Sequence, residues 1–311
     1  MFDTSKSIRL SVVTPVFNAQ VDQLRALAAS LHAAVAGAAA EWLLIDDHSD
    51  RAETLACLDE LAREPGVRVL CNPGRKGAAG ARNHGAGQAQ ADLLFFVDAD
   101  DLLLPGSIKH LLEILAGRPG IRWLVGDFED FSGPAPDLHA ALEEHGQPGT
   151  EVENWPDAAN RLVFETLVNQ GAYIIDKALF AELGGFDPRF TVGEDWYLWM
   201  RLAVRRELHH CNCLVMLRRR GHASTMSGPL SATAAIVAPY LAARRDPLFA
   251  AQRRLLRWRI YRLYRLLSER NRVLGRRAAT TRYALLAAVW AINEPQQWAN
   301  VWRALSGSEL R

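Results

Sequence analysis

The fold of this chain is decided by the stretch Leu93-Leu94-Phe95-Phe96-Val97-Asp98-Ala99-Asp100-Asp101. An apolar run without polar alternation is typical of a strand buried on both faces of a parallel sheet, and we expect one over 92–97. This strand leads directly into a group of carboxylates. Asp98 and Asp100 suit a hard divalent cation, which prefers oxygen ligands, with a diphosphate as its natural second ligand. Aspartate-rich turns are also common as solvated helix caps, so the meaning of this one depends on its surroundings.

Upstream of this stretch, short apolar runs alternate with segments of helical periodicity. Strands are expected over 8–17, 42–45 and 67–70, and helices over 21–36, 54–63, 78–90 and, after the aspartates, 105–116. Continuous apolar strands that alternate with helices predict an α/β fold with a mostly parallel sheet flanked by helices on both faces.

A second acidic pair, Asp46-Asp47, ends the second expected strand. In open parallel sheets the ligand binds beyond the carboxyl ends of the strands, so both acidic clusters are expected at one edge, where we predict an active site. A carboxylate there can accept hydrogen bonds from a nucleobase or a ribose. It can equally cap the next helix, and position alone does not separate the two interpretations.

A glycine-rich segment follows the third expected strand. Gly74, Gly77, Gly80 and Gly85 bracket the cations Arg75, Lys76 and Arg82 together with Asn83. The spacing matches neither a dinucleotide-binding fingerprint nor a P-loop. A close-approach backbone with cations suits a phosphate, and a flexible loop before a tightly packed helix is the alternative.

Three polar residues in the second half are weaker candidates. Glu194 and Asp195 stand at the start of an expected helix, where acids are ordinary caps. His222 is isolated, and a lone histidine is more often structural than a ligand.

The segment 131–157, which follows the aspartates, is rich in Pro, Gly, Glu and His and is expected to be an irregular excursion near the site. Regular structure is expected to resume over 161–168 and 172–175.

The C-terminal region is strongly basic. Between Arg244 and Arg282 there are 13 arginines and two acids, while Leu256, Ile260, Leu263, Tyr264 and Leu267 share one helical face. This pattern predicts a basic amphipathic helix. It either docks on an anionic membrane or packs on the catalytic domain or in a homo-oligomer interface. Nucleic acid is disfavoured because no matching motif accompanies the charge.

Bulk properties limit the remaining choices. The 311 residues carry a net charge of +1, which predicts no particular partner. The first residues lack the apolar core of a signal peptide, and no apolar run is long enough to span a membrane. We therefore expect a cytoplasmic protein, with peripheral contact with the inner face of the membrane as an option.

Taken in order along the chain, seven motifs resemble those of the family 2 glycosyltransferases, which have the GT-A fold. They are Val12-Val13-Thr14-Pro15-Val16-Phe17-Asn18, Asp46-Asp47-His48-Ser49, Gly80-Ala81-Arg82-Asn83-His84-Gly85, Asp98-Ala99-Asp100-Asp101, Gly184-Gly185-Phe186-Asp187, Gly193-Glu194-Asp195-Trp196 and His222. The resemblance covers residues 8 to 227. It implies a catalytic domain over 1–227 and leaves 228–311 as a basic, helical module.

The resemblance also implies a role for each motif. The nucleotide, typically uridine, would be held by Thr14, Pro15, Phe17, Asn18, Asp46 and Asp47, and the ribose, diphosphate or sugar would lie near Gly80, Arg82 and Asn83. The sugar and a Mn²⁺ or Mg²⁺ ion would be bound by the Asp98-Ala99-Asp100 turn, with His222 as a further metal ligand. Asp195 would be the general base and Glu194 its neighbour.

Such an enzyme inverts the anomeric centre by direct displacement, with a carboxylate deprotonating the acceptor hydroxyl and the metal stabilising the leaving nucleotide. Two departures from the family pattern matter. His48 stands where the family most often has glycine, so the turn there is expected to differ slightly. The Gln-x-x-Arg-Trp signature of processive synthases is absent, which favours addition of one sugar to a glycan, lipid-linked or other acceptor.

Two other functions fit parts of this pattern. A nucleotidyltransferase also pairs a metal with a parallel sheet, but it needs a glycine-rich phosphate loop after the first strand, where this chain has Pro15-Val16-Phe17-Asn18. A non-catalytic scaffold with a transferase fold is the other alternative. The presence of all the candidate acids gives it no support.

Overall fold

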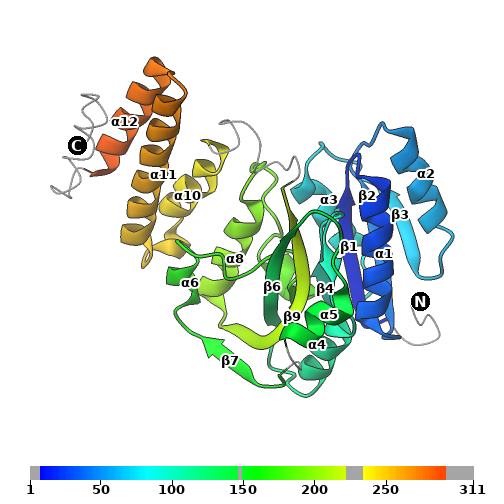
Figure 1. Cartoon of the computed structure of the whole chain (residues 1–311). Coiled ribbons are helices and arrows are strands. Elements are labelled where there is room, and N and C mark those ends of the chain that lie inside the picture. Colours follow the sequence, from blue (N-terminus) through cyan, green and yellow to red (C-terminus); the bar gives the residue numbers. More distant parts are fainter. Residues whose placement is uncertain (1–7, 146–148, 222–233, 292–311) are drawn as a thin grey trace. The chain divides into compact units, whose positions relative to one another are not determined.

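In the computed structural model, residues 8–145, 149–221 and 234–291 are described. The chain forms two compact units (Figure 1). The first comprises Met1–Ala158, Thr166–Arg189 and Arg205–His222, and the second comprises Ala159–Glu165, Phe190–Val204 and Ala223–Arg311. The predicted boundary between 227 and 228 stays a prediction.

The first unit begins with the alternating strands and helices that the sequence predicts. They are β1 (Leu10–Val16), α1 (Val21–Val35), β2 (Ala40–Asp46), α2 (Ala52–Leu61), β3 (Val67–Cys71), α3 (Ala78–Gln88), β4 (Leu93–Phe96) and, after the short β5 (Leu102–Leu103), α4 (Ser107–Ala116). Every one of the expected elements up to α4 is therefore present, with no end shifted by more than two residues.

One sheet runs through this unit, with the strand order β3-β2-β1-β4-β8-β6-β9-β5 and with β7 paired to β9. The pairs among β3, β2, β1 and β4 are parallel, as is β6 with β9, whereas β4–β8, β6–β8, β5–β9 and β7–β9 are antiparallel. The predicted α/β class with a largely parallel, helix-flanked sheet is confirmed, and the antiparallel strands are an addition to it.

Helices cover both faces of the parallel strands. Val12 and Leu44 belong to the same buried cluster as the apolar residues of α1 and α4. On the opposite face, a β-carbon added at Gly85 of α3 would lie 2.4 Å from Val13 and 3.1 Å from Ile45. Glycine is therefore required at position 85, because it lets α3 lie directly on the sheet.

The later elements were predicted less well. The strands β6 (Trp123–Ser132) and β9 (Leu208–Arg220) were not expected, and the segment 131–157 contains α5 (Leu138–His145) and the edge strand β7 (Val152–Trp155). The prediction of regular structure over 161–168 was wrong, because α6 (Ala158–Arg161) ends at the first residue of that range. The remaining elements are β8 (Tyr173–Asp176) and α7 (Lys177–Glu182).

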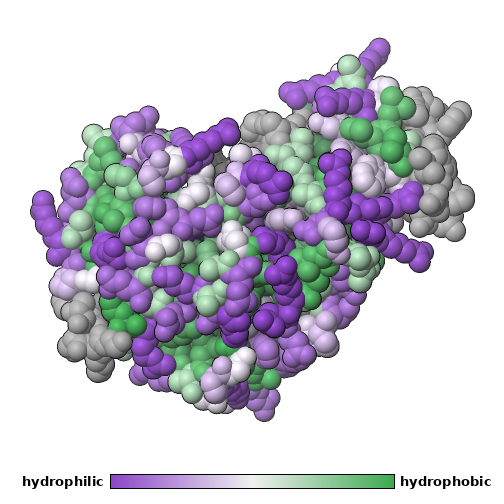
Figure 2. All heavy atoms as spheres, turned by 180° about the vertical axis from the view of Figure 1, so that it is seen from behind, coloured by the Kyte–Doolittle hydropathy of each residue, from purple (hydrophilic) through white to green (hydrophobic). Residues whose placement is uncertain are grey.

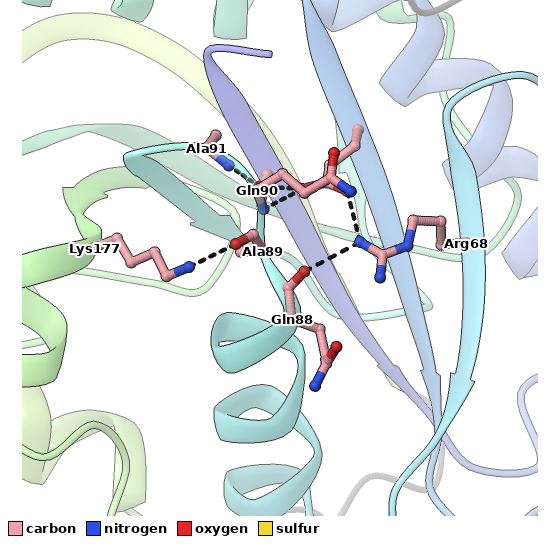
Figure 3. A network of polar contacts seen from close by, with 8 residues as sticks. Arg68, Gln88, Ala89, Gln90, Ala91 and Lys177 are labelled. Carbon is pink, nitrogen blue, oxygen red and sulfur yellow. Dashed lines mark hydrogen bonds and ion pairs between the residues drawn. The ribbon is translucent and has the colours of Figure 1, made fainter.

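A buried carboxylate fixes the amino-terminal side of the sheet. Glu41 of β2 is 2% exposed and accepts hydrogen bonds from Ser11 Oγ (2.6 Å), Gln90 N (2.6 Å) and Arg68 (3.0 Å). Arg68 also donates to the carbonyl of Gln88, as Figure 3 shows. These contacts join β1, β2 and β3 to the connection between α3 and β4, and so hold α3 and the start of β4 in register with the other strands.

The second unit is helical. It contains α8 (Glu194–Arg205), α10 (Val237–Arg245), the 3-10 turn η1 (Pro247–Phe249), α11 (Arg253–Val273) and α12 (Arg277–Ala291). The predicted apolar face of the basic helix is confirmed, since Leu256, Ile260, Leu263 and Leu267 are buried. No helix in the described part of the chain has the length and apolar character needed to cross a membrane.

Candidate active site

The carboxyl ends of β2, β1 and β4 meet at one edge of the sheet, as the sequence predicts. Val16 is in register with Asp46, and the backbone N–H of Val97 donates to the carbonyl of Val13 in the neighbouring strand. The loops after these three strands carry the Asp46-Asp47 pair, the Phe17-Asn18 turn and the aspartate cluster. The first unit therefore brings together most of the predicted donor-binding residues.

Asp98 is held by a cation from α3. Arg82 Nη2 donates to Asp98 Oδ1 at 2.6 Å. The Arg82 side chain is 5% exposed, whereas that of Asp98 is 39% exposed. Arg82 also lies over the ring of Phe186, 5.4 Å from its centroid. A buried cation beside an accessible carboxylate is suited to a phosphate-bearing ligand, because the cation can bind the phosphate oxygens.

The next carboxylate, Asp101, has a different environment. It is 4% exposed and accepts the backbone N–H of Arg219 at 2.9 Å, while Arg219 Nε donates to the carbonyl of Asp100 at 3.0 Å. Burial, aided by the charges of Asp98 and Asp100, holds the pKa of Asp101 well above its usual range. Asp101 and Arg219 therefore anchor the turn that presents Asp98 and Asp100.

Asp47 is used inside the protein. Its two oxygens accept Asn72 Nδ2 at 2.6 Å and the backbone N–H of Gly77 at 2.8 Å, and the residue is 4% exposed. Asp47 thereby fixes the glycine-rich segment that precedes α3. Asp46 is more open, and its Oδ1 accepts the N–H of Ser49 at 3.1 Å.

The turns after β1 and β2 are joined to each other. Asn18 accepts from the N–H groups of Asp50 and Arg51 and donates its own N–H to Ser49 Oγ. Asn18 has φ 48° and His48 has φ 66°. The left-handed conformation of His48 is one that glycine would adopt without strain.

Two further predicted nucleotide ligands lie at different depths. Thr14 is fully buried, and its hydroxyl accepts from Trp42 Nε1 at 3.0 Å. Phe17 is 44% exposed, and Lys76 Nζ lies 3.0 Å from its ring centroid. Phe17 and Lys76 together offer an aromatic surface and a cation at the strand end, while the Thr14 side chain supports β1 against β2.

Asn83 links α3 to the Gly184-Gly185-Phe186 motif. Its Nδ2 donates to the carbonyl of Phe186 at 2.7 Å, and its Oδ1 accepts the Phe186 N–H at 2.9 Å. At Gly185, which has φ +67°, an added β-carbon would lie 2.5 Å from Asn83 Oδ1. This close approach explains the glycine at position 185. At Gly80, the remaining predicted residue of α3, an added β-carbon would lie 3.3 Å from the carbonyl oxygen of Arg75.

The candidate base lies in the second unit, at the start of α8. Asp195 Oδ1 accepts the N–H of Trp196, and Glu194 is 8% exposed. Trp196 stacks on Tyr240 with their ring centroids 3.9 Å apart. Gly193 has φ +82°, and an added β-carbon would lie 2.9 Å from Pro239. These local contacts define where α8 begins. His222 lies outside the described residues.

Asp98 and Asp100 are the candidate metal ligands of this turn. Among the described residues, no group of three or more His, Cys, Asp or Glu side chains is arranged to hold a metal ion. Mg²⁺ is commonly bound through about one or two carboxylates plus substrate phosphates and water, and Asp98 and Asp100 suit that mode. Ala99 separates them in the turn and offers no ligand atom in its side chain.

Sequence reasoning missed the supporting roles of Asp101 and Arg219. The signal that was available is the run Leu217-Arg218-Arg219-Arg220, in which three cations end an apolar segment. Without the pairing of β5 with β9, however, nothing places that run beside the aspartates.

Comparisons with known proteins agree with this arrangement. The family described as Glycosyl transferase family 2 matches residues 11–127. The Escherichia coli UDP-Glc:alpha-D-GlcNAc-diphosphoundecaprenol beta-1,3-glucosyltransferase WfgD is 24% identical over 209 residues, which are 66% of this chain and 73% of WfgD. The Myxococcus xanthus O-antigen biosynthesis protein RfbC is 34% identical over 220 residues, which are 70% of this chain but 16% of RfbC.

A solved structure has a similar fold. It is S. aureus TarS 1–349 in complex with UDP-GlcNAc, with a TM-score of 0.66 and 14% sequence identity. The superposition covers 98% of this chain and 93% of the TarS chain.

Proposed function

The chain belongs to the family 2 glycosyltransferases, enzymes that use nucleotide-sugar donors. We propose that it moves one sugar from a UDP-sugar to an acceptor hydroxyl. The proposed reaction is a direct displacement that inverts the anomeric centre and needs a divalent metal. The observation that carries the proposal is the convergence of Asp46, Asp98, Asp100 and Arg82 at one edge of the sheet.

A UDP-sugar is the donor we favour. The name of WfgD gives UDP-Glc as its substrate, and TarS has been solved with UDP-GlcNAc. In this chain, Phe17 can pack on the base, and Asp46 can accept hydrogen bonds from the base or ribose. Asp47, whose oxygens are already used, would act by holding the segment around Gly77, and Thr14, Pro15 and Asn18 by shaping the turn after β1.

Asp98 and Asp100 are the residues that would hold Mn²⁺ or Mg²⁺, together with the diphosphate and with His222 as a further ligand. The metal supplies stabilisation of the charge that develops on the departing diphosphate. Arg82 would also stabilise the leaving diphosphate. Its guanidinium lies 2.6 Å from Asp98, and its other N–H groups can donate hydrogen bonds to a phosphate oxygen. Asn83 and Gly80 would position α3 for this contact.

Asp195 is the proposed general base, with Glu194 supporting it. A hydroxyl is a weak nucleophile, so a carboxylate in reach must take its proton as the new bond forms. One displacement by the acceptor on the face opposite the leaving group inverts the anomeric centre and needs no covalent intermediate.

The acceptor we favour is the sugar of a lipid-linked diphosphate in the assembly of a cell-envelope polysaccharide. The name of WfgD describes a transfer of glucose to a sugar linked to diphosphoundecaprenol. The name of RfbC describes O-antigen biosynthesis. The Bacillus subtilis relative named as a minor teichoic acid biosynthesis protein, GgaB, points to an envelope polymer as well.

The test is hydrolysis or transfer with a panel of UDP-sugars, with Mn²⁺ and with a chelator. Wild type should turn over at least one donor in Mn²⁺ and lose that activity with the chelator. Asp100→Asn should reduce the rate by about 100-fold or more, because the variant loses a ligand to the metal that would stabilise the charged leaving group. Asp59→Asn, at an exposed carboxylate of α2, is the matched control and should retain full activity. Turnover that is equal with chelator and unchanged in Asp100→Asn would contradict the metal-dependent mechanism.

A further inference from the structure

Exposed apolar side chains gather on the last two described helices. Among the large hydrophobic residues that are exposed in the described part of the chain, six lie on α11, on α12 or in the turn between them: Trp258, Leu266, Val273, Leu274, Leu285 and Val289. Val273 is 76% exposed and Leu274 is 57% exposed, although the same helices bury a separate apolar face. Packing among the described residues therefore buries one side of this helical hairpin and leaves the other side exposed.

The same surface is strongly basic. Residues 253–291 contain 11 arginines and a single acid, Glu269. We call residues 270–277 the hairpin tip. In it, Val273, Leu274 and Gly275 lie between the pairs Arg270/Arg272 and Arg276/Arg277. Figure 2 shows this mixture on the C-terminal helices, where long hydrophilic side chains project around green apolar surface.

The outer face of α12 continues the pattern. Leu285 and Val289 are one helical turn apart and exposed, and Arg282 precedes Leu285 by three residues. The opposite face of this helix carries the buried Ala287, Ala288 and Ala291, which pack with Tyr261 of α11. The apolar outer face is therefore distinct from the face that holds the hairpin together.

The tip lies at the far end of a long helix. Helix α11 has 21 residues, which at 1.5 Å per residue gives a rod of about 30 Å between its start after η1 and the tip. In Figure 1 the turn between α11 and α12 forms the end of the hairpin, away from α10.

We propose that the hairpin tip and the outer face of α12 dock on an anionic lipid bilayer, with Val273, Leu274, Leu285 and Val289 entering the interfacial region and Arg276, Arg277 and Arg282 binding headgroup phosphates. Arginine and apolar side chains in alternation suit this partner, because the guanidinium stays at the headgroups while the apolar groups leave water. A polyanion in solution would use the arginines and leave Val273 and Leu274 exposed. A second copy of the chain would bring like charges together.

The inference does not rest on the proposed transfer reaction, and its test needs no substrate. The full chain is floated with vesicles of equal parts phosphatidylglycerol and phosphatidylcholine, and with vesicles of phosphatidylcholine alone, at low and high salt. We expect binding to the anionic vesicles at low salt, weakening as salt screens the charges, and little binding to the neutral ones.

Two double variants separate the contributions. Arg276→Gln with Arg277→Gln should weaken vesicle binding by about 30-fold, at roughly fivefold per arginine. Val273→Ser with Leu274→Ser should weaken it by about tenfold or more while leaving heparin binding unchanged. The matched control is Leu55→Ser with Arg63→Gln, an exposed apolar residue and an exposed arginine of the first unit, which should bind like wild type. Because all these side chains are exposed, thermal unfolding should be the same for every variant.

Several results would overturn the proposal. One is the absence of anionic-vesicle binding at low salt, and another is equal binding by wild type and both hairpin variants. Vesicle binding that falls in the arginine variant but is unchanged in the serine variant would assign the arginines to a polyanion partner. A change of oligomeric state in sedimentation, with vesicle binding unchanged, would assign the surface to self-association.

Discussion

At the scale of single residues, the carboxylates of the candidate site divide between two tasks. Asp47 and Asp101 are buried and accept backbone N–H groups, whereas the Asp98 side chain is 39% exposed and Asp46 is partly open. Spacing in the sequence locates all of them at one edge but does not reveal this division, since it depends on which loops fold over each oxygen. The use of the Thr14 hydroxyl by Trp42 is hidden from the sequence for the same reason.

The role of Asp195 can be tested by kinetics. Asp195→Asn preserves size and hydrogen bonding at the start of α8 but cannot take a proton, so kcat should fall by about 100- to 10,000-fold while the donor KM stays near the wild-type value. Steady-state rates with saturating acceptor would measure this. Glu207→Gln, at an exposed acid just after α8, is the control and should leave both constants unchanged. Transfer by Asp195→Asn at the wild-type rate would exclude this residue as the base.

The close approach at Gly185 predicts a stability effect. Gly185→Ala should lower the free energy of unfolding by more than Gly37→Ala does, because Gly37 has a similar φ of +78° but open space around it. We expect about 1 kcal/mol for the left-handed conformation at either position, and at least about 1 kcal/mol more at Gly185 for the 2.5 Å contact with Asn83.

Urea unfolding of both variants supplies the measurement. Combining Gly185→Ala with Asn83→Ala provides the cross-check, because removing the amide should recover part of the extra cost. Equal losses for Gly185→Ala and Gly37→Ala would show that the contact with Asn83 is easily relieved.

At the scale of elements, the quality of prediction follows the range of the contacts. The strands β1 to β4 and helices α1 to α4 repeat a local pattern, in which each apolar run is followed by an amphipathic helix, and that pattern is readable from neighbouring residues. Strand β9 was not predicted because its partners β6, β5 and β7 come from three distant segments. In the same way, α5 is a short helix of eight residues within a segment whose composition suggests a loop.

The pairing of β6 with β9 has a pH-dependent component. Arg218 donates two hydrogen bonds to Asp130, at 2.6 and 3.0 Å, and this contact holds the pKa of the Asp130 carboxyl below its usual value of 3.8. A lowered pKa in the folded state means that the contribution to stability is present above pH 3.8 and is lost as pH falls through the folded-state pKa.

Asp130→Asn should therefore reduce the free energy of unfolding by about 1 kcal/mol or less at neutral pH, since the ion pair is partly exposed to solvent. Urea titrations of wild type and variant at neutral pH and near pH 3 would measure the difference. Glu53→Gln, an exposed acid of α2, serves as the control, with no difference expected. A gap between Asp130→Asn and wild type that stays constant down to the lowest pH would assign the effect to packing and not to the ion pair.

At the scale of the whole molecule, the chain combines a sheet whose edge collects carboxylates with a helical unit that carries Asp195 and the arginine-rich hairpin. The sequence predicts both parts, because one depends on strand-helix alternation and the other on a basic amphipathic helix. It does not predict that α8 shares a compact unit with the C-terminal helices. That grouping arises from aromatic packing, such as Trp196 on Tyr240, between residues far apart in sequence.

Ligand binding should stabilise the folded molecule in a metal-dependent way. UDP with Mn²⁺ at about 100 times its Kd would add about 2.7 kcal/mol to the free energy of unfolding, because the ligand binds only the folded state. In thermal unfolding, the Tm should therefore rise by a few degrees with UDP and Mn²⁺ together and by much less with UDP and a chelator. Asp100→Asn should lose most of the shift, whereas Asp59→Asn should keep it. An equal shift with and without the metal would mean that Arg82 and the turns after β1 and β2 bind the nucleotide without a cation at Asp98 and Asp100.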